Sequence, residues 1–223
     1  MKVVVIGAGR SGTGLAARLV KDKHAVTLVD RDEASCKRAF EQFGIATLVG
    51  DGTDPAILSE AGADRADVLV ALLRHDADNL AIALLGREMG ARRVMARMRD
   101  SGYAKVYRAA GVEEIVSEVD ILVSALHIAA LHPRVRGSMR LGGGESVAFE
   151  VVVPESAAAA GKTVRELASH AAFPAGAVFA GVTDERGTMI GPRGDSVILP
   201  RGSVIVVAPE SAIDDVTELL TKR

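Results

Sequence analysis

The first twelve residues constrain the fold of this chain more than any other stretch. A β-branched run, Val3 to Ile6, breaks into GAGRSG, which has glycines at positions 7, 9 and 12. In this spacing Gly7 permits a tight turn out of a strand, Gly9 lets a pyrophosphate approach the backbone, and Gly12 lets the next helix pack closely. A phosphate would then lie at the helix N-terminus, where free N–H groups favour an anion. The pattern therefore predicts a nucleotide site at this turn.

Short apolar runs alternate with helix-like stretches from residue 1 to about 118, as in crossover units on a parallel sheet. We expect strands over 2–6, 25–29, 46–49, 68–72, 94–97 and 114–116, and helices over 12–21, 34–43, 55–61 and 79–89. Asp54 before Pro55 is a favourable helix start. Near-continuous apolar strands suit a sheet covered on both faces. The sequence thus predicts an α/β fold with a Rossmann-like, doubly wound parallel sheet.

The second part of the chain has a different character. Residues 119–133, VDILVSALHIAALHP, are apolar all round when placed on a helix, which indicates burial on more than one side. We interpret this helix as crossing to a second domain and packing against a second subunit. RGSMRLGGGES, after it, is predicted to be a linker. Strands at 147–153, 177–182 and 203–207, with helices at 164–169 and 211–220, then indicate a small α+β module whose core is marginal unless it docks or dimerises.

These patterns divide the chain into three parts. We expect a nucleotide-binding domain over 1–120, a crossover and dimerisation helix with its linker over 121–138, and a small C-terminal domain over 139–223.

Three charged residues refine the predicted nucleotide site. Asp30 ends the second strand about 20 residues after the glycines, where a carboxylate accepts hydrogen bonds from a ribose diol. It would repel a 2′-phosphate, so NADP is the least expected dinucleotide; the alternative role for Asp30 is to cap the next helix. Arg31 would pair with a phosphate, stack on adenine or remain solvated. Arg10 lies where a guanidinium can span phosphate oxygens.

Further candidates follow the third and fourth strands. The Asp51 carboxylate is placed to accept from an adenine amino group, with Gly52 and Thr53 closing the loop over the base. Alternatively, Asp51 and Thr53 cap the following helix. Ala71 and Leu72 would form the apolar wall of the adenine or second-ribose pocket, or belong simply to the core.

Composition and spacing argue against several other functions. The net charge of −2 gives no bulk reason to expect a nucleic-acid partner. No apolar run reaches the roughly 18 residues of a spanning helix, and the single Cys36 closes no internal disulfide, which favours a soluble cytoplasmic protein. Tyr103 and Lys105 lack the four-residue spacing of a catalytic pair. His127 and His132 face different sides of one helix with no carboxylate or cysteine nearby in sequence, so we predict neither a catalytic residue nor a metal site.

Several motifs together resemble one known family. GAGRSGTGLAARL, HAVTLVDRD and VGDGTDPAILSEAGADRADVLVAL, followed by Asn79 and ARMRD, are similar to the nucleotide-binding domain of the TrkA/KTN/RCK family, the cytosolic regulators of bacterial potassium transporters and channels. GKTVREL and ILPRGSVIVVAPESAIDDV resemble its small C-terminal ligand-sensing module, with Ser203 where an Asp is usual.

The resemblance implies a function and a set of ligands. It implies binding of an adenine nucleotide (NAD(H), ATP or ADP), homodimers that assemble into an octameric ring, and ligand-dependent shape changes that gate a membrane-embedded potassium transporter or channel at the inner face of the cell membrane. A small NAD-dependent oxidoreductase is the alternative. Whether the C-terminal domain binds a cyclic dinucleotide, another small ligand or none stays open.

The resemblance also assigns roles to individual residues. Phosphates would be held by Gly7, Gly9, Arg10, Ser11 and Gly12, the ribose by Asp30, and the adenine side by Asp51, Gly52 and Thr53; Arg97 matches a family arginine that can face the phosphates. Many relatives carry Pro-Glu after the sixth strand, and the glutamate can support a divalent metal. This chain has SEVD, with Val119 at the glutamate position and Glu118 and Asp120 as imperfect substitutes, so a metal is in doubt.

Overall fold

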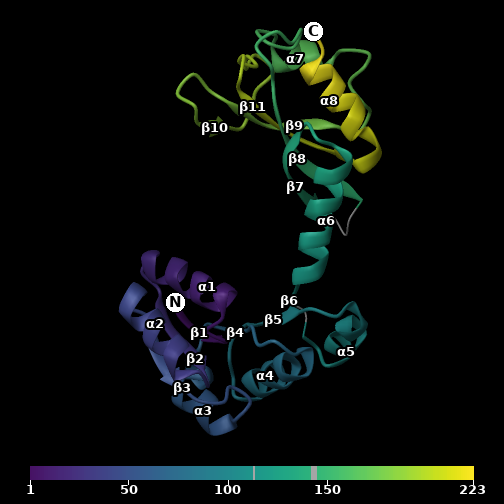
Figure 1. Ribbon diagram of the computed structural model, residues 1–223. Coiled ribbons are helices and arrows are strands. Elements are labelled where there is room, and N and C mark those ends of the chain that lie inside the picture. The colour runs from purple at the N-terminus through teal and green to yellow at the C-terminus, as the bar shows by residue number, and fades with distance from the viewer. Residues whose placement is uncertain (113, 142–144) are drawn as a thin grey trace. The chain divides into compact units, whose positions relative to one another are not determined.

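The chain folds into two compact units, Met1–Val119 (unit 1) and Asp120–Arg223 (unit 2). The computed structural model describes residues 1–112, 114–141 and 145–223 (Figure 1). None of the helices in these ranges combines the length and apolarity needed to cross a membrane.

Unit 1 contains a six-stranded parallel sheet in the order β3-β2-β1-β4-β5-β6. Its strands are β1 (Lys2–Ile6), β2 (Ala25–Asp30), β3 (Ala46–Val49), β4 (Val68–Ala71), β5 (Val94–Met98) and β6 (Glu114–Ser117). The predicted Rossmann-like, doubly wound sheet is confirmed. Because β1 lies between β2 and β4, the strand order reverses there, and ligands of such sheets bind outside the carboxyl ends of the strands at this point.

Helices cover both faces of this sheet (Figure 1). They are α1 (Arg10–Lys21), α2 (Glu33–Phe43), α3 (Pro55–Glu60), α4 (Asp76–Glu88) and α5 (Ala104–Ala109). Alternate side chains of β1 face opposite cores: Val5 packs in a cluster with Ala16 of α1, whereas Ile6 packs in a cluster with Leu58 of α3 and Ile82 of α4. Strands buried on both faces explain the near-continuous apolar runs in the sequence.

Unit 2 is built on a five-stranded antiparallel sheet in the order β10-β9-β11-β8-β7. The strands are β7 (Val135–Leu141), β8 (Ser146–Val152), β9 (Val178–Thr183), β10 (Met189–Ile190) and β11 (Ser203–Pro209), with helices α7 (Val164–Ala168) and α8 (Ile213–Thr221). Alternate residues of the central strands, such as Phe149 and Val206, form a core with Ile213 of α8. This architecture confirms the predicted α+β character of the C-terminal part.

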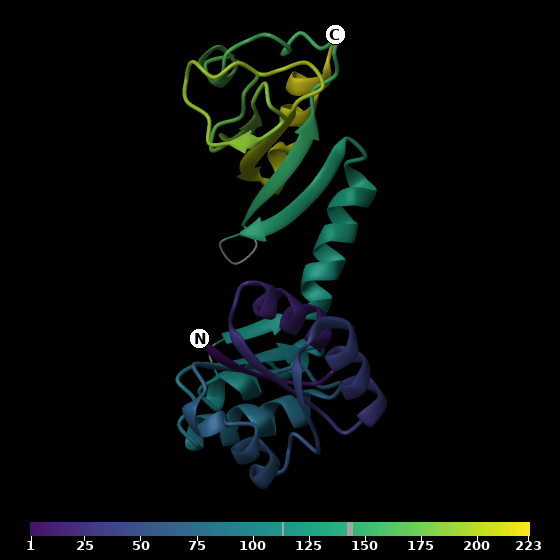
Figure 2. The same cartoon turned by 90° about the vertical axis from the view of Figure 1, so that its left-hand side faces the viewer.

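The predicted linker is wrong over residues 136–141. These residues belong to β7, which pairs along β8 from Val135 opposite Val151 to Leu141 opposite Ser146 (Figure 2). Gly137 follows a register shift, so the small residues that suggested a linker accommodate an irregular strand instead. Residues 142–144 of the predicted linker lie outside the described part of the chain.

Helix α6 (Glu118–Leu131) begins in unit 1 and continues into unit 2. Six of its apolar side chains are 42–62% exposed in the single chain: Val119, Ile121, Leu122, Val123, Leu126 and Leu131. Ile128 is its one fully buried side chain among the described residues. Burial of this helix on more than one side therefore requires a second copy of the chain, so that prediction stays a prediction.

Candidate nucleotide site

The glycine loop between β1 and α1 has a geometry that only glycines permit. Gly7 has φ of +112°, and a Cβ there would lie 2.9 Å from the carbonyl oxygen of Leu72. A Cβ on Gly12 would lie 1.8 Å from the carbonyl oxygen of Gly7. Nothing lies within 4 Å of the Cβ position of Gly9, the residue that precedes α1. The loop thus packs tightly on its inner side and is open at Gly9, as close approach of a ligand to the backbone requires.

The N-terminus of α1 fits an anion. Gly9 occupies the N-cap position, and no side chain there accepts from the first-turn N–H groups. Arg10 and Ser11 are exposed, and the Arg10 guanidinium has no hydrogen bond or ion pair with any residue in the described ranges. Uncapped N–H groups, an open glycine and an unpaired guanidinium together form a cradle whose chemistry suits phosphate oxygens.

Asp30, at the end of β2, holds the glycine loop from the side. Its Oδ2 accepts from the Ala8 N–H at 2.6 Å, and its Oδ1 accepts from the Asp32 N–H at 2.9 Å. Asp32 caps α2 by accepting from the N–H groups of Ala34 and Ser35, so Asp30 is not the cap of that helix. A carboxylate has about four acceptor positions, so the half-buried Asp30 retains capacity for ribose hydroxyls.

The loop after β3 lies at the same edge of the sheet as Asp30, where the carboxyl ends of the strands meet. Asp51 Oδ1 accepts from both the N–H and the hydroxyl of Thr53, at 2.9 and 2.7 Å. These bonds, the backbone one foremost, lower the pKa of the Asp51 carboxyl, and the Arg31 guanidinium 3.8 Å away acts in the same direction. Asp54, not Asp51 or Thr53, caps α3. Asp51 is therefore an ionised acceptor that organises its own turn.

Gly52 is buried against the end of β1. A Cβ there would lie 2.1 Å from Cγ2 of Ile6, so the loop after β3 approaches the glycine-loop strand only because residue 52 has no side chain. This contact brings the predicted adenine-side residues to the same edge of the sheet as the glycine loop.

The residues at the end of β4 take part in the site through backbone groups more than through the predicted apolar wall of side chains. Ala71 is fully buried in the core. Leu72 is half-buried, and its N–H donates to the carbonyl of Ile6 at 2.8 Å. Arg97 of β5 donates from Nη2 to the carbonyl oxygens of Leu72 and Leu73, at 3.0 and 2.8 Å. In this structure the Arg97 guanidinium therefore binds backbone carbonyls instead of lying free to meet phosphates.

Asn79 of α4 was not among the candidate residues. It is fully buried, and its Oδ1 accepts from the Leu73 N–H at 2.7 Å while its Nδ2 donates to the carbonyls of Leu73 and Arg97. The available signal was an amide directly before the apolar run LAIALL, because a polar side chain that is buried at such a position needs hydrogen-bond partners.

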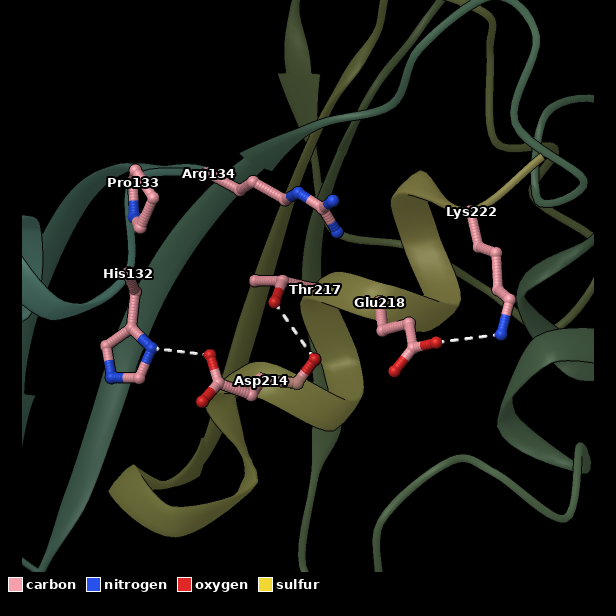
Figure 3. A pocket seen from close by; sticks show the side chains of 7 residues that line it. All are labelled: His132, Pro133, Arg134, Asp214, Thr217, Glu218 and Lys222. Atoms are coloured by element: carbon pink, nitrogen blue, oxygen red, sulfur yellow. Dashed lines mark hydrogen bonds and ion pairs between the residues drawn. The ribbon is translucent and has the colours of Figure 1, made fainter.

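Two histidines have carboxylate partners from distant parts of the sequence. His132 Nδ1 lies 2.7 Å from Asp214 Oδ1, and His127 Nδ1 lies 3.3 Å from Glu210 Oε1. Figure 3 shows His132 beside a pocket of about 490 Å³ between the start of β7 and α8, where Lys222 pairs with Glu218 at 2.8 Å. Within the described ranges, no group of three or more His, Cys, Asp or Glu is placed to hold a metal ion.

Comparisons with known proteins identify two domains of one family in this chain. Residues 3–118 match the TrkA-N domain and residues 148–221 match the TrkA-C domain. The chain is 30% identical to a Trk system potassium uptake protein TrkA homolog of Pyrococcus abyssi, covering 100% of this chain and 99% of that protein.

Solved structures show the same fold. The GsuK channel aligns with a TM-score of 0.71 at 22% identity, and a GsuK channel bound to NAD aligns with a TM-score of 0.68 at 21% identity. Each comparison covers 99% of this chain and 39% of the GsuK chain, so this protein corresponds to about two-fifths of that channel polypeptide.

Proposed function

Since the chain belongs to the TrkA family of potassium uptake proteins, we propose that it is a regulatory subunit that binds an adenine nucleotide at the glycine loop and thereby gates a membrane potassium transporter or channel. The observation that carries the proposal is the pairing of the open, uncapped α1 N-terminus with the Asp30 carboxylate beside it. Family membership favours this regulatory role over the NAD-dependent oxidoreductase.

The proposed ligand is NAD(H), ATP or ADP. In this arrangement Gly7, Gly9, Arg10, Ser11 and Gly12 hold the phosphates, Asp30 binds the ribose, and the loop of Asp51, Gly52 and Thr53 with Arg31 lies toward the adenine. Ala71, Leu72 and Arg97 form the edge of the pocket through the end of β4. The fold that this chain shares with the NAD-bound GsuK channel supports the choice of an adenine nucleotide. Asp30 disfavours a 2′-phosphate by charge repulsion.

A nucleotide titration tests the site. We expect mass spectrometry of the purified protein to find a co-purifying adenine nucleotide, and calorimetry with ATP, ADP and NADH to give saturable binding. Asp30→Ala should weaken binding by roughly 1–3 kcal/mol because charge-assisted hydrogen bonds to the ribose are lost. Asp32→Ala is the matched control: it removes an acidic side chain two residues away whose partners, Ala34, Ser35 and Arg38, all belong to α2. Equal affinities for wild type and Asp30→Ala would remove Asp30 from the site.

We propose that the functional unit is a homodimer that assembles into an octameric ring. The exposed apolar side chains of α6 support this, because a helix this apolar is stable in water only when another surface covers it. Native mass spectrometry tests the assembly. Leu122→Glu, in the middle of the exposed stretch, should shift the protein toward monomer, and an unchanged oligomer would place the interface elsewhere.

The proposed partner is the pore-forming subunit of a potassium transporter or channel, which places the protein at the inner face of the cell membrane. Cells that lack this chain should take up potassium slowly when external potassium is scarce. Wild-type protein should restore uptake, and Asp30→Ala should restore it less. Full restoration by Asp30→Ala, once its loss of binding is verified, would separate nucleotide binding from transport.

A further inference from the structure

A polar network in unit 1 joins the edge of the proposed nucleotide site to the first turn of α6. The Arg97 guanidinium, whose side chain is 16% exposed, uses Nη2 to hold the carbonyls of Leu72 and Leu73. Its Nη1 donates to Oε2 of Glu118, the first residue of α6, at 2.9 Å. One rigid, planar group therefore binds the end of β4 and the start of α6 at the same time.

The carbonyl of Leu72 lies close to the backbone of the glycine loop. It is the atom nearest to the Cβ position of Gly7, at 2.9 Å, and the Leu72 N–H is bound to the carbonyl of Ile6. Because there is no room even for one further carbon between Gly7 and this carbonyl, a ligand that moves the Gly7 backbone toward Leu72 presses on the group that Arg97 holds.

Asn79 keeps the two strand ends together. It binds both backbone groups of Leu73 and the carbonyl of Arg97, so the end of β4 and the adjoining part of β5 move as one piece. The pair between Arg97 and the more exposed Glu118 carboxylate is then the contact that can give way.

The Arg97 guanidinium is also incompletely satisfied. Its Nε is buried and donates to no acceptor within the described residues. A buried N–H without a partner is costly, which brings a second orientation of the guanidinium closer in free energy. A linkage of this kind needs two arrangements of similar free energy that a ligand can bias.

We propose that Arg97 is a positioning residue that couples nucleotide binding at the glycine loop to the first turn of α6 through its ion pair with Glu118. This inference rests on the proposed function, because it assigns the route by which the same site acts on the rest of the chain. Since α6 continues from unit 1 into unit 2, its first turn is a point where a change at the nucleotide site reaches the C-terminal part. Linkage is reciprocal, so breaking the pair must also change nucleotide affinity.

Two variants break the pair from opposite sides. Glu118→Gln removes the charge from α6, and Arg97→Lys leaves α6 intact but cannot bind two carbonyls and a carboxylate with the same fork. Glu114→Gln is the matched control, because Glu114, the first residue of β6, makes a two-point ion pair at 2.9 and 2.6 Å with Arg93, the residue before β5, at the opposite end of this strand pair from Arg97.

The measurement is hydrogen exchange of the first-turn amides of α6 in the full chain, with and without saturating NADH or ADP, alongside calorimetric affinity. In wild type and Glu114→Gln we expect the nucleotide to change the exchange rate by about fivefold or more. In Glu118→Gln and Arg97→Lys we expect saturating nucleotide to change this exchange rate by less than about twofold. Their affinity for the nucleotide should differ from that of wild type by about fivefold.

Each other outcome counts against the coupling. A nucleotide response in both pair-breaking variants equal to that of wild type overturns it. Binding to wild type without any response in α6 also overturns it while leaving nucleotide binding in place. Absence of binding of NADH, ATP and ADP to wild type overturns the coupling and the proposed function together.

Discussion

The same substitution at two positions of one helix is expected to have opposite effects on stability. Gly12 and Gly14 both lie in the first half of α1. A Cβ on Gly12 would lie 1.8 Å from a backbone oxygen of Gly7, whereas a Cβ on Gly14 has nothing within 4 Å. Gly14→Ala therefore gains only the helix preference of alanine, roughly 0.5–1 kcal/mol.

The magnitude for Gly12→Ala follows from the overlap. The Cβ and the Gly7 oxygen must separate from 1.8 Å to at least 3.0 Å, and both the helix and the loop that must move are backbone. Such overpacking costs roughly 1–3 kcal/mol. A rigid neighbour favours the upper end of that range, so after the gain in helix preference we expect a net loss of about 2 kcal/mol in the free energy of unfolding.

The assay uses the single cysteine of the chain. Cys36 lies in α2 and is 1% exposed, so labelling of its thiol in urea reports the unfolding of unit 1. With a urea dependence of about 2 kcal/mol per M, the midpoint should fall by about 1 M for Gly12→Ala and rise by roughly 0.3–0.5 M for Gly14→Ala. A Gly12→Ala midpoint at or above that of wild type would refute the claim that Gly12 is required by packing.

Two further predictions concern titrating groups. Burial, and secondarily the charge of Asp30, raise the pKa of the Cys36 thiol. At pH 8 the native protein should therefore react with a thiol reagent on the order of 100-fold more slowly than the unfolded chain. Equal reaction rates would show that α2 opens freely. Hydrogen bonds from Thr163 lower the pKa of Glu166 in the folded state, so its contribution to unit 2 is present at neutral pH and is lost as the pH falls through that lowered pKa. The difference in melting temperature between wild type and Glu166→Gln should accordingly shrink as the pH is lowered through the titration of Glu166, and a difference that stays constant with pH would assign the effect to packing.

The sequence predicts unit 1 well because its strands are buried on both faces. Continuous β-branched runs such as Val3 to Ile6 leave little choice of element, and the glycine spacing then determines how the first strand meets the first helix. The first strand of unit 2 was missed because β7 contains Gly137 and exposed polar residues, and its pairing with β8 depends on register rather than on local preference. Apolar character indicates that α6 needs to be covered, but it does not identify the surface that covers it.

Contacts within the candidate site depend on positions that sequence spacing does not determine. Asp30 could be predicted to lie near the glycine loop, but its bond to the Ala8 N–H follows from the exact placement of two strand ends. The partner of Arg97 on α6 is 21 residues away, and the partner of His132 is 82 residues away. A long side chain has several rotamers that point to different acceptors, and the position of each acceptor is known only once the chain is folded.

The carboxylate of Asp30 bears on the speed of binding as well as its strength. Both of its oxygens are already held by backbone N–H groups, on the glycine loop and at Asp32, before any ligand arrives. A nucleotide would therefore meet acceptors and donors in place and lose little free energy to ordering the loop. Association should then be governed by diffusion and orientation, so nucleotides of different affinity should differ mainly in how long they stay bound.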